Sequence, residues 1–80
     1  MQVVPGRSLF EISDVSAAGE VRRAAVSMAG LLGFDESSSG SVAIIAAELS
    51  KNIAIHARHG QIQLRPLERD GISGIELVAK

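Results

Sequence analysis

The chain has 80 residues and a mass of 8.4 kDa, with eight basic and nine acidic side chains and no cysteine. This length suits one small domain with a thin core, and the lack of cysteine excludes disulfides and thiolate metal sites. A formal net charge of −1 gives no electrostatic reason to bind nucleic acid or an anionic membrane. No apolar run approaches the roughly 20 residues that cross a bilayer, and the first residues do not resemble a signal peptide. We therefore expect one cytoplasmic domain over residues 1–80 that binds neither nucleic acid nor membranes.

The first half of the chain predicts a strand followed by a helix. Alternating residues predict a short strand over Ser8–Ile12. Ser13 and Asp14 supply N-cap chemistry, and apolar residues at helical spacing predict a helix over residues 15–32. Gly33 follows where a left-handed residue commonly ends a helix. The expected buried face of this helix consists of Ala18, Val21, Ala25, Met28, Ala29 and Leu32.

The second half predicts a loop, a second helix and a β-hairpin. Residues 35–40 are typical of a loop that leads into a helix start, and the helix itself is expected from about residue 41 to residue 57 or 58, before Gly60. Gln61–Arg65 alternates as a strand, and Ile72–Ala79 is the returning strand after an Asp-Gly turn. The order β-α-α-β-β predicts an α+β fold, a two-layer sandwich of two helices on a sheet with a C-terminal hairpin.

The second predicted helix has polar residues inside its apolar arc. Projected at about 100° per residue, Glu48, Asn52 and His56 form one stripe. The apolar residues on either side of this stripe are Val42, Ile44, Ile45, Leu49, Ile53 and Ile55. The residues expected to face solvent are Ala43, Ala47, Lys51, Ala54 and Arg58.

A carboxylate inside an apolar arc needs an explanation, because burying an unpaired charge is costly. Two interpretations stay open. In the first, Glu48 reaches the edge of the arc and pairs with an arginine such as Arg65, or caps a loop. In the second, the stripe lines a polar pocket that receives a ligand.

The segment Ala47–Ala57, AELSKNIAIHA, resembles the N-box of the GHKL (Bergerat-fold) ATPases, whose core pattern is E-x-x-x-N on a helix. Residues 31–34 at the end of the preceding helix and the sequence Gly60–Ile62 extend this resemblance. Together they are similar to the serine/threonine kinases and anti-sigma factors of the RsbT and RsbW type, with RsbT the closest. The resemblance covers roughly residues 8–80 and implies a partial Bergerat fold.

The resemblance implies roles for three residues. Glu48 matches the general base that deprotonates the attacking hydroxyl. Asn52 matches the residue that binds both the nucleotide and its Mg²⁺ ion, and His56 matches a position near the nucleotide. The cofactors implied for the intact domain are ATP and Mg²⁺. Lys51 is expected to be a solvated lysine.

Two other sequences that a GHKL site requires do not occur in the 80 residues. These are the G1 box, D-x-G-x-G, and the G2 box, G-x-G. The segment Asp70–Gly74 comes nearest to G1, but Ile72 stands in place of the first required glycine. The resemblance therefore implies an N-terminal portion of the kinase domain, which alone would be inactive and would bind Mg-ATP weakly or not at all.

The implied function is phosphorylation of a STAS-domain antagonist, with regulation of a stress-response phosphatase of the PP2C type or of a sigma-factor pathway. Two alternatives stay open: a non-catalytic protein-interaction module, and an RsbW-type anti-sigma factor that binds a sigma factor directly. Open strand edges and apolar patches on a partial fold also favour a homodimer.

Overall fold

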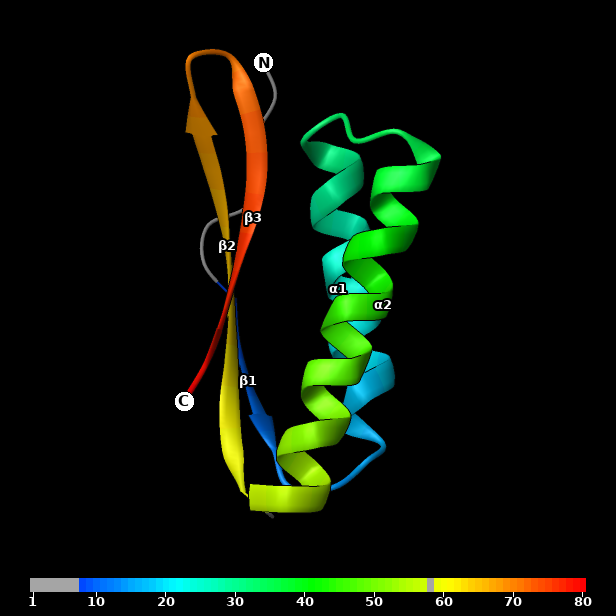
Figure 1. The fold of residues 1–80 in the computed structure, drawn as a ribbon, viewed down its shortest axis with the longest axis vertical. Coiled ribbons are helices and arrows are strands. Elements are labelled where there is room, and N and C mark those ends of the chain that lie inside the picture. Colours follow the sequence, from blue (N-terminus) through cyan, green and yellow to red (C-terminus); the bar gives the residue numbers. More distant parts are fainter. Residues whose placement is uncertain (1–7, 58) are drawn as a thin grey trace.

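The computed structural model describes residues 8–57 and 59–80. Within them the chain is a small α+β domain in which two helices cover one face of a three-stranded antiparallel sheet (Figure 1). The α+β class predicted from the sequence pattern is confirmed. The elements in chain order are β1 (Ser8–Ile12), α1 (Ala17–Leu31), α2 (Glu36–Asn52), the π-helical turn η1 (Ile53–Ala57), β2 (Gly60–Arg69) and β3 (Ile72–Ala79).

The sheet has the order β1-β2-β3, and β2 is its longest strand. β1 pairs only with the first half of β2, as far as Ser8 opposite Leu64, whereas β3 pairs with β2 up to the hairpin turn. The sequence predicted that β2 would end at Arg65, but the strand continues through Pro66 to Arg69. Pro66 lies beyond Leu64, the last residue of β2 that pairs with β1. On the β1 side of Pro66 no described strand needs a backbone donor, so a proline is tolerated there.

The hairpin turn and the end of α1 both follow the predicted chemistry. Asp70 and Gly71 have φ angles of 52° and 80°, as a two-residue turn of the primed type requires. Gly33 has a φ of 82°. Its N–H donates to the Gly30 carbonyl, and the N–H of Phe34 donates to the Ala29 carbonyl, which is the Schellman ending of a helix.

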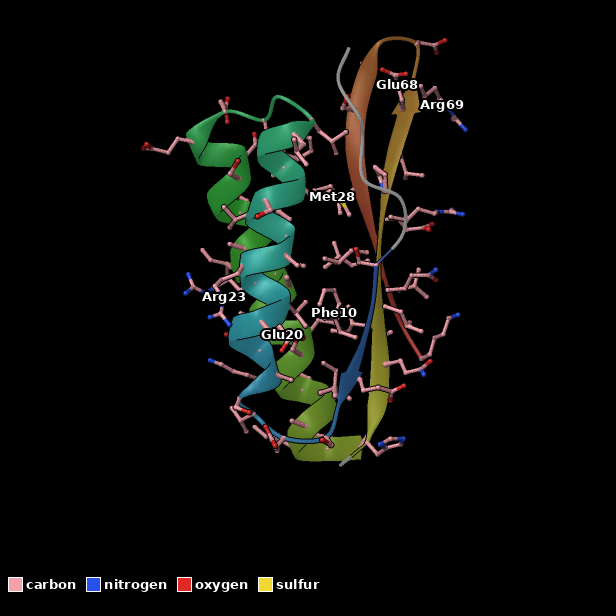
Figure 2. All side chains as sticks on the ribbon, turned by 180° about the vertical axis from the view of Figure 1, so that it is seen from behind. Phe10, Glu20, Arg23, Met28, Glu68 and Arg69 are labelled. Atoms are coloured by element: carbon pink, nitrogen blue, oxygen red, sulfur yellow. The ribbon has the colours of Figure 1, made fainter. Side chains whose placement is uncertain are left out.

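The core lies between the helices and the inner face of the sheet. It contains Ile12, Val21, Ala25, Met28, Ala46, Ile53, Ile62 and Leu64. The predicted buried face of α1 is confirmed, since five of its six members are buried and Leu32 packs against the core while half-buried. Figure 2 shows Phe10 of β1 and Met28 of α1 pointing into the space between the two layers.

The second helix begins earlier than the sequence predicted. It starts at Glu36, so the expected loop over residues 35–40 is wrong. Asp35 has an extended backbone with a ψ of 174°, and its side chain accepts a hydrogen bond of 2.7 Å from the N–H of Ser38. This N-cap starts the helix at once, although serines and a glycine in its first turns lower the intrinsic helix propensity.

The predicted orientation of this helix is also wrong. Its fully buried residues are Ala43, Ala46 and Ser50, and the core extends through Ile53 at the start of η1. Three isoleucines expected in the apolar arc are instead exposed: Ile44 by 65%, Ile45 by 54% and Ile55 by 60%. Closely packed helices bury small side chains where their backbones approach, and here this requirement outweighs the hydrophobicity of the isoleucines.

Candidate functional site

The candidate site is the outer face of α2. Glu48 and Asn52 lie one turn apart on it, and both side chains are exposed. The exposed isoleucines Ile44 and Ile45 belong to the same helix, and the exposed Ile55 follows in η1. The structure therefore brings the predicted base and the predicted magnesium ligand together, within an exposed apolar surface and not inside the core.

Glu48 reaches water and pairs weakly. Its side chain is 63% exposed, and its Oε1 lies 3.5 Å from Nζ of Lys51, which is itself 47% exposed. An exposed pair of this kind contributes about 0–1 kcal/mol to stability. The predicted pairing of Glu48 with Arg65 is wrong, because Arg65 forms a 2.7 Å ion pair with Glu76 on the neighbouring strand. Lys51 is exposed, as the sequence predicted.

His56 lies outside the continuous α-helix. α2 ends at Asn52, and His56 belongs to the π-helical turn that follows, where backbone bonds span five residues in place of four. The wider turn changes the rotation per residue, so the α-helical projection does not determine the direction of His56. Its side chain is exposed.

The outer face of α2 lies beside the free edge of the sheet. Among the strands, α2 has its main contacts with β3, while α1 lies over all three strands. Figure 1 shows β3 and α2 on the same side of the molecule, in front of β1 and α1. By helix periodicity, Ile45 and Asn52 lie on the same flank of the exposed face of α2.

The oxygen donors of this face suit a magnesium ion that arrives with phosphates. A carboxylate and an amide oxygen are hard ligands, and protein sites for Mg²⁺ commonly supply only one or two of them beside substrate phosphates and water. Within residues 8–57 and 59–80, no group of three or more His, Cys, Asp or Glu side chains could hold a metal ion. The amide oxygen of Asn52 is by chemistry compatible with an ion held mainly by phosphates and water.

Two clefts lie elsewhere, at the hairpin end of the molecule. One, of about 260 Å³, is lined by Leu67, Arg69, Asp70, Ile72, Ser73 and Gly74. The other, of about 230 Å³, lies between Leu32 and the hairpin residues Pro66, Leu67, Glu68 and Ser73. Figure 2 shows Glu68 and Arg69 at this end. No lining residue of either cleft belongs to α2, so the face that carries Glu48 is separate from both.

The sequence analysis did not single out Ser50, which is fully buried. Its hydroxyl donates a 2.7 Å hydrogen bond to the carbonyl of Ala46 one turn earlier. Such a bond satisfies a buried hydroxyl inside a helix, so Ser50 has a structural role. The spacing of Ala43, Ala46 and Ser50 was the available signal, because small residues at helical spacing are typical of a close helix contact.

Two carboxyl groups have lowered pKa values, and neither belongs to the candidate site. The pKa of Asp14 is lowered by the hydroxyl and then the N–H of Ser16. The pKa of Asp35 is lowered by the N–H of Ser38 and then by its side chain. Both groups accept hydrogen bonds at helix starts, which accounts for their direction of shift without any catalytic role.

Comparison of the chain with protein-family models, with curated proteins and with solved structures gives no match. Within the described part of the chain, no helix is long and apolar enough to cross a membrane.

Proposed function

We propose that α2 carries the N-box of a serine/threonine protein kinase of the RsbT type, which phosphorylates a STAS-domain protein. The observation that carries the proposal is the position of Glu48 and Asn52, one turn apart and accessible on the outer face of α2. The base must reach the hydroxyl that attacks the γ-phosphate, and the metal ligand must reach an ion on the same triphosphate. A spacing of one helical turn is compatible with both.

The surroundings of the two residues also support a nucleotide site. Ile45 gives the same side of the helix an apolar surface, which suits one wall of a base- or sugar-binding pocket.

In this proposal Glu48 orients and deprotonates the attacking serine or threonine hydroxyl. Asn52 holds the Mg²⁺ ion that bridges the phosphates, and the ion neutralises charge as the γ-phosphoryl group is transferred. His56 contributes at most at the rim of the nucleotide site.

The 80 residues contain neither a D-x-G-x-G nor a G-x-G sequence. The 80 residues alone are therefore expected to bind Mg-ATP weakly or not at all. In this proposal, phosphate transfer requires a polypeptide that also contains the G1 and G2 boxes. The partial Bergerat fold is part of the same proposal, and the β-α-α-β-β order of the elements is compatible with it.

The test measures the transfer of labelled γ-phosphate from ATP to a STAS-domain protein. The enzyme in this assay is the protein in the form that its own cells produce. Glu48→Gln and Asn52→Ala are each expected to abolish transfer, because one removes the base and the other the magnesium ligand. Glu20→Gln is the matched control, since Glu20 is an exposed glutamate on α1. Transfer that survives in both α2 variants would contradict the proposal.

A second candidate function is a non-catalytic module that holds partner proteins. The exposure of Ile44, Ile45 and Ile55 favours it, because exposed apolar side chains gathered on one face commonly mark interaction surfaces. An RsbW-type anti-sigma factor belongs to this class, with a sigma factor as the partner. If a STAS-domain protein or sigma factor binds the Glu48→Gln variant as tightly as the wild type while no phosphate transfer occurs in either, the binding function stands alone.

A further inference from the structure

The free edge of β3 is a long strand edge without a described neighbour. Within residues 8–57 and 59–80 the sheet ends at β3, which is eight residues long. Gln61 and Lys80 exchange both backbone hydrogen bonds, at 3.1 and 2.9 Å. Because bonded and non-bonded pairs alternate in an antiparallel ladder, the N–H and C=O groups of every odd-numbered residue of β3 point away from β2. Four residues, Ser73, Ile75, Leu77 and Ala79, therefore present backbone donors and acceptors at this edge.

Within residues 8–57 and 59–80, the edge of β3 lacks the features with which proteins usually prevent further strand pairing. The segment ISGIELVA has no proline and no lysine, and its one charged residue, Glu76, is already paired with Arg65 of the same sheet. The opposite side of the sheet differs. There the described part of β1 spans the five residues Ser8–Ile12, and Pro66 removes a backbone donor from the part of β2 that lies beyond them. The sheet is therefore open to extension mainly across β3.

The side chains of β3 favour a second copy of the same strand. When two copies pair antiparallel about a two-fold axis, residues directly opposite one another must point to the same face. Two registers align seven residues of each strand: one centred on Ile75 and one centred on Glu76. The second places the two Glu76 carboxylates opposite each other, which is unfavourable. The first places Ile75 opposite its symmetry mate, and Glu76 opposite Gly74.

The register centred on Ile75 also covers the most exposed residue of the strand. Ile72 is 74% exposed, and this register sets it opposite Val78 of the second copy. Both helix layers stay on one face of the extended sheet, because a two-fold axis perpendicular to the sheet preserves its faces.

We propose that two copies of this chain pair through β3 in the register centred on Ile75 and form one continuous six-stranded sheet. The six strands follow from two three-stranded sheets joined at their free edges. The two strands exchange backbone hydrogen bonds at Ser73, Ile75 and Leu77 of each copy. This inference does not rest on the proposed kinase function, because no residue of the paired edge belongs to the candidate nucleotide site.

Sedimentation equilibrium of the 80-residue chain is the first measurement, with a dimer of twice 8.4 kDa expected. Gly74→Lys and Gly74→Glu form a matched pair of variants, since a Cβ added at Gly74 meets no atom within 4 Å. The lysine is set opposite Glu76 of the second copy and strengthens the dimer, whereas the glutamate weakens it. Because the contact occurs twice in the dimer, we expect the dissociation constant of the glutamate variant to exceed that of the lysine variant by at least about tenfold.

Disulfide cross-linking determines the register of the two strands. The chain has no cysteine of its own, so only the introduced cysteines can form disulfides. A mixture of the Ile72→Cys and Val78→Cys chains is expected to form a mixed disulfide under mild oxidation. A mixture of Gly74→Cys and Val78→Cys, which the register centred on Glu76 would join, is expected not to. A wild-type chain that stays monomeric, equal dissociation constants for the two Gly74 variants, or cross-linking only in the second mixture would each overturn the proposal. A monomer would leave the edge to a different partner or segment.

Discussion

A Cβ atom added to Gly60 would lie 2.8 Å from Cγ2 of Ile53 and 3.0 Å from the carbonyl oxygen of Lys80. Gly60 is the first residue of β2, and it is buried where the π-helical turn and the end of β3 meet. The glycine is required here by the close approach of neighbouring atoms.

The first prediction concerns this contact. Gly60→Ala is expected to lower the free energy of unfolding by about 1–3 kcal/mol, because the methyl group overpacks a buried site whose neighbours include backbone. Gly74→Ala is the control, since its added Cβ meets nothing within 4 Å and the change costs little or nothing. Urea unfolding measures both. Equal midpoints for the two variants would show that the contact at Gly60 relaxes freely.

The second prediction tests the orientation of α2 with two isoleucines nine positions apart. Ile53→Ala is expected to destabilise the protein by about 2–5 kcal/mol, because it leaves a cavity in the core. Ile44→Ala is expected to change the free energy of unfolding by no more than about 0.5 kcal/mol, because Ile44 is 65% exposed. Thermal unfolding followed by circular dichroism measures both. The orientation first predicted from the sequence would make the two losses comparable.

The third prediction concerns Ser50, a fully buried residue of α2. Ser50→Leu is expected to cost about 1–3 kcal/mol, since the site is fully buried and has room only for a small side chain. Ser50→Ala should be close to neutral, because the donor and the bond to Ala46 are removed without leaving a buried group unpaired. Ser41→Leu, at an exposed position of the same helix, controls for the size of leucine.

The fourth prediction concerns the pH dependence of stability at Asp35. The pKa of this carboxyl is lowered in the folded chain by hydrogen bonds from Ser38, so the folded state binds its proton less readily than the unfolded state does. The contribution of Asp35 to stability is therefore present above the unfolded pKa, near pH 4, and is lost as the pH falls through the lower folded pKa.

Asp35→Ala should thus be less stable than the wild type at neutral pH, and the difference should shrink below about pH 4. Asp35→Asn keeps a capping side chain without a titrating group, so its unfolding midpoint should lack this part of the acid dependence. A difference between wild type and Asp35→Ala that stays constant from neutral to acid pH would contradict the assignment.

Local chemistry predicted most of the fold. The strands Ser8–Ile12 and Ile72–Ala79, the buried face of α1 and the left-handed Gly33 all follow from spacing and turn residues over a few positions. The start of α2 was missed because a loop-like run of serines concealed the N-cap at Asp35. The length of β2 was missed because proline usually ends a strand, and only the tertiary position of Pro66 shows that no donor is needed there.

The candidate site was predicted less well than the fold. The spacing of Glu48 and Asn52 placed both on one face of a helix, and they do share it. The projection failed to show that this face points outward. Small residues such as Ala46, which fit against another helix, decide which face of α2 is buried. A projection that weights residues by hydrophobicity cannot detect that preference. The π-helical turn that contains His56 was not predicted, because such a turn is not visible in the spacing of the sequence.

The π-helical turn at Ile53–Ala57 has a consequence for chain length. A π-turn contains one more residue than the α-turn it replaces, and this surplus lies between the last turn of α2 and the fixed position of Gly60. A related chain that lacked one residue in this segment could close the same turn as regular α-helix and still enter β2 at the same place. We therefore expect the deletion of one residue from this segment to change the turn between the helix layer and the sheet and to leave the strand register unchanged.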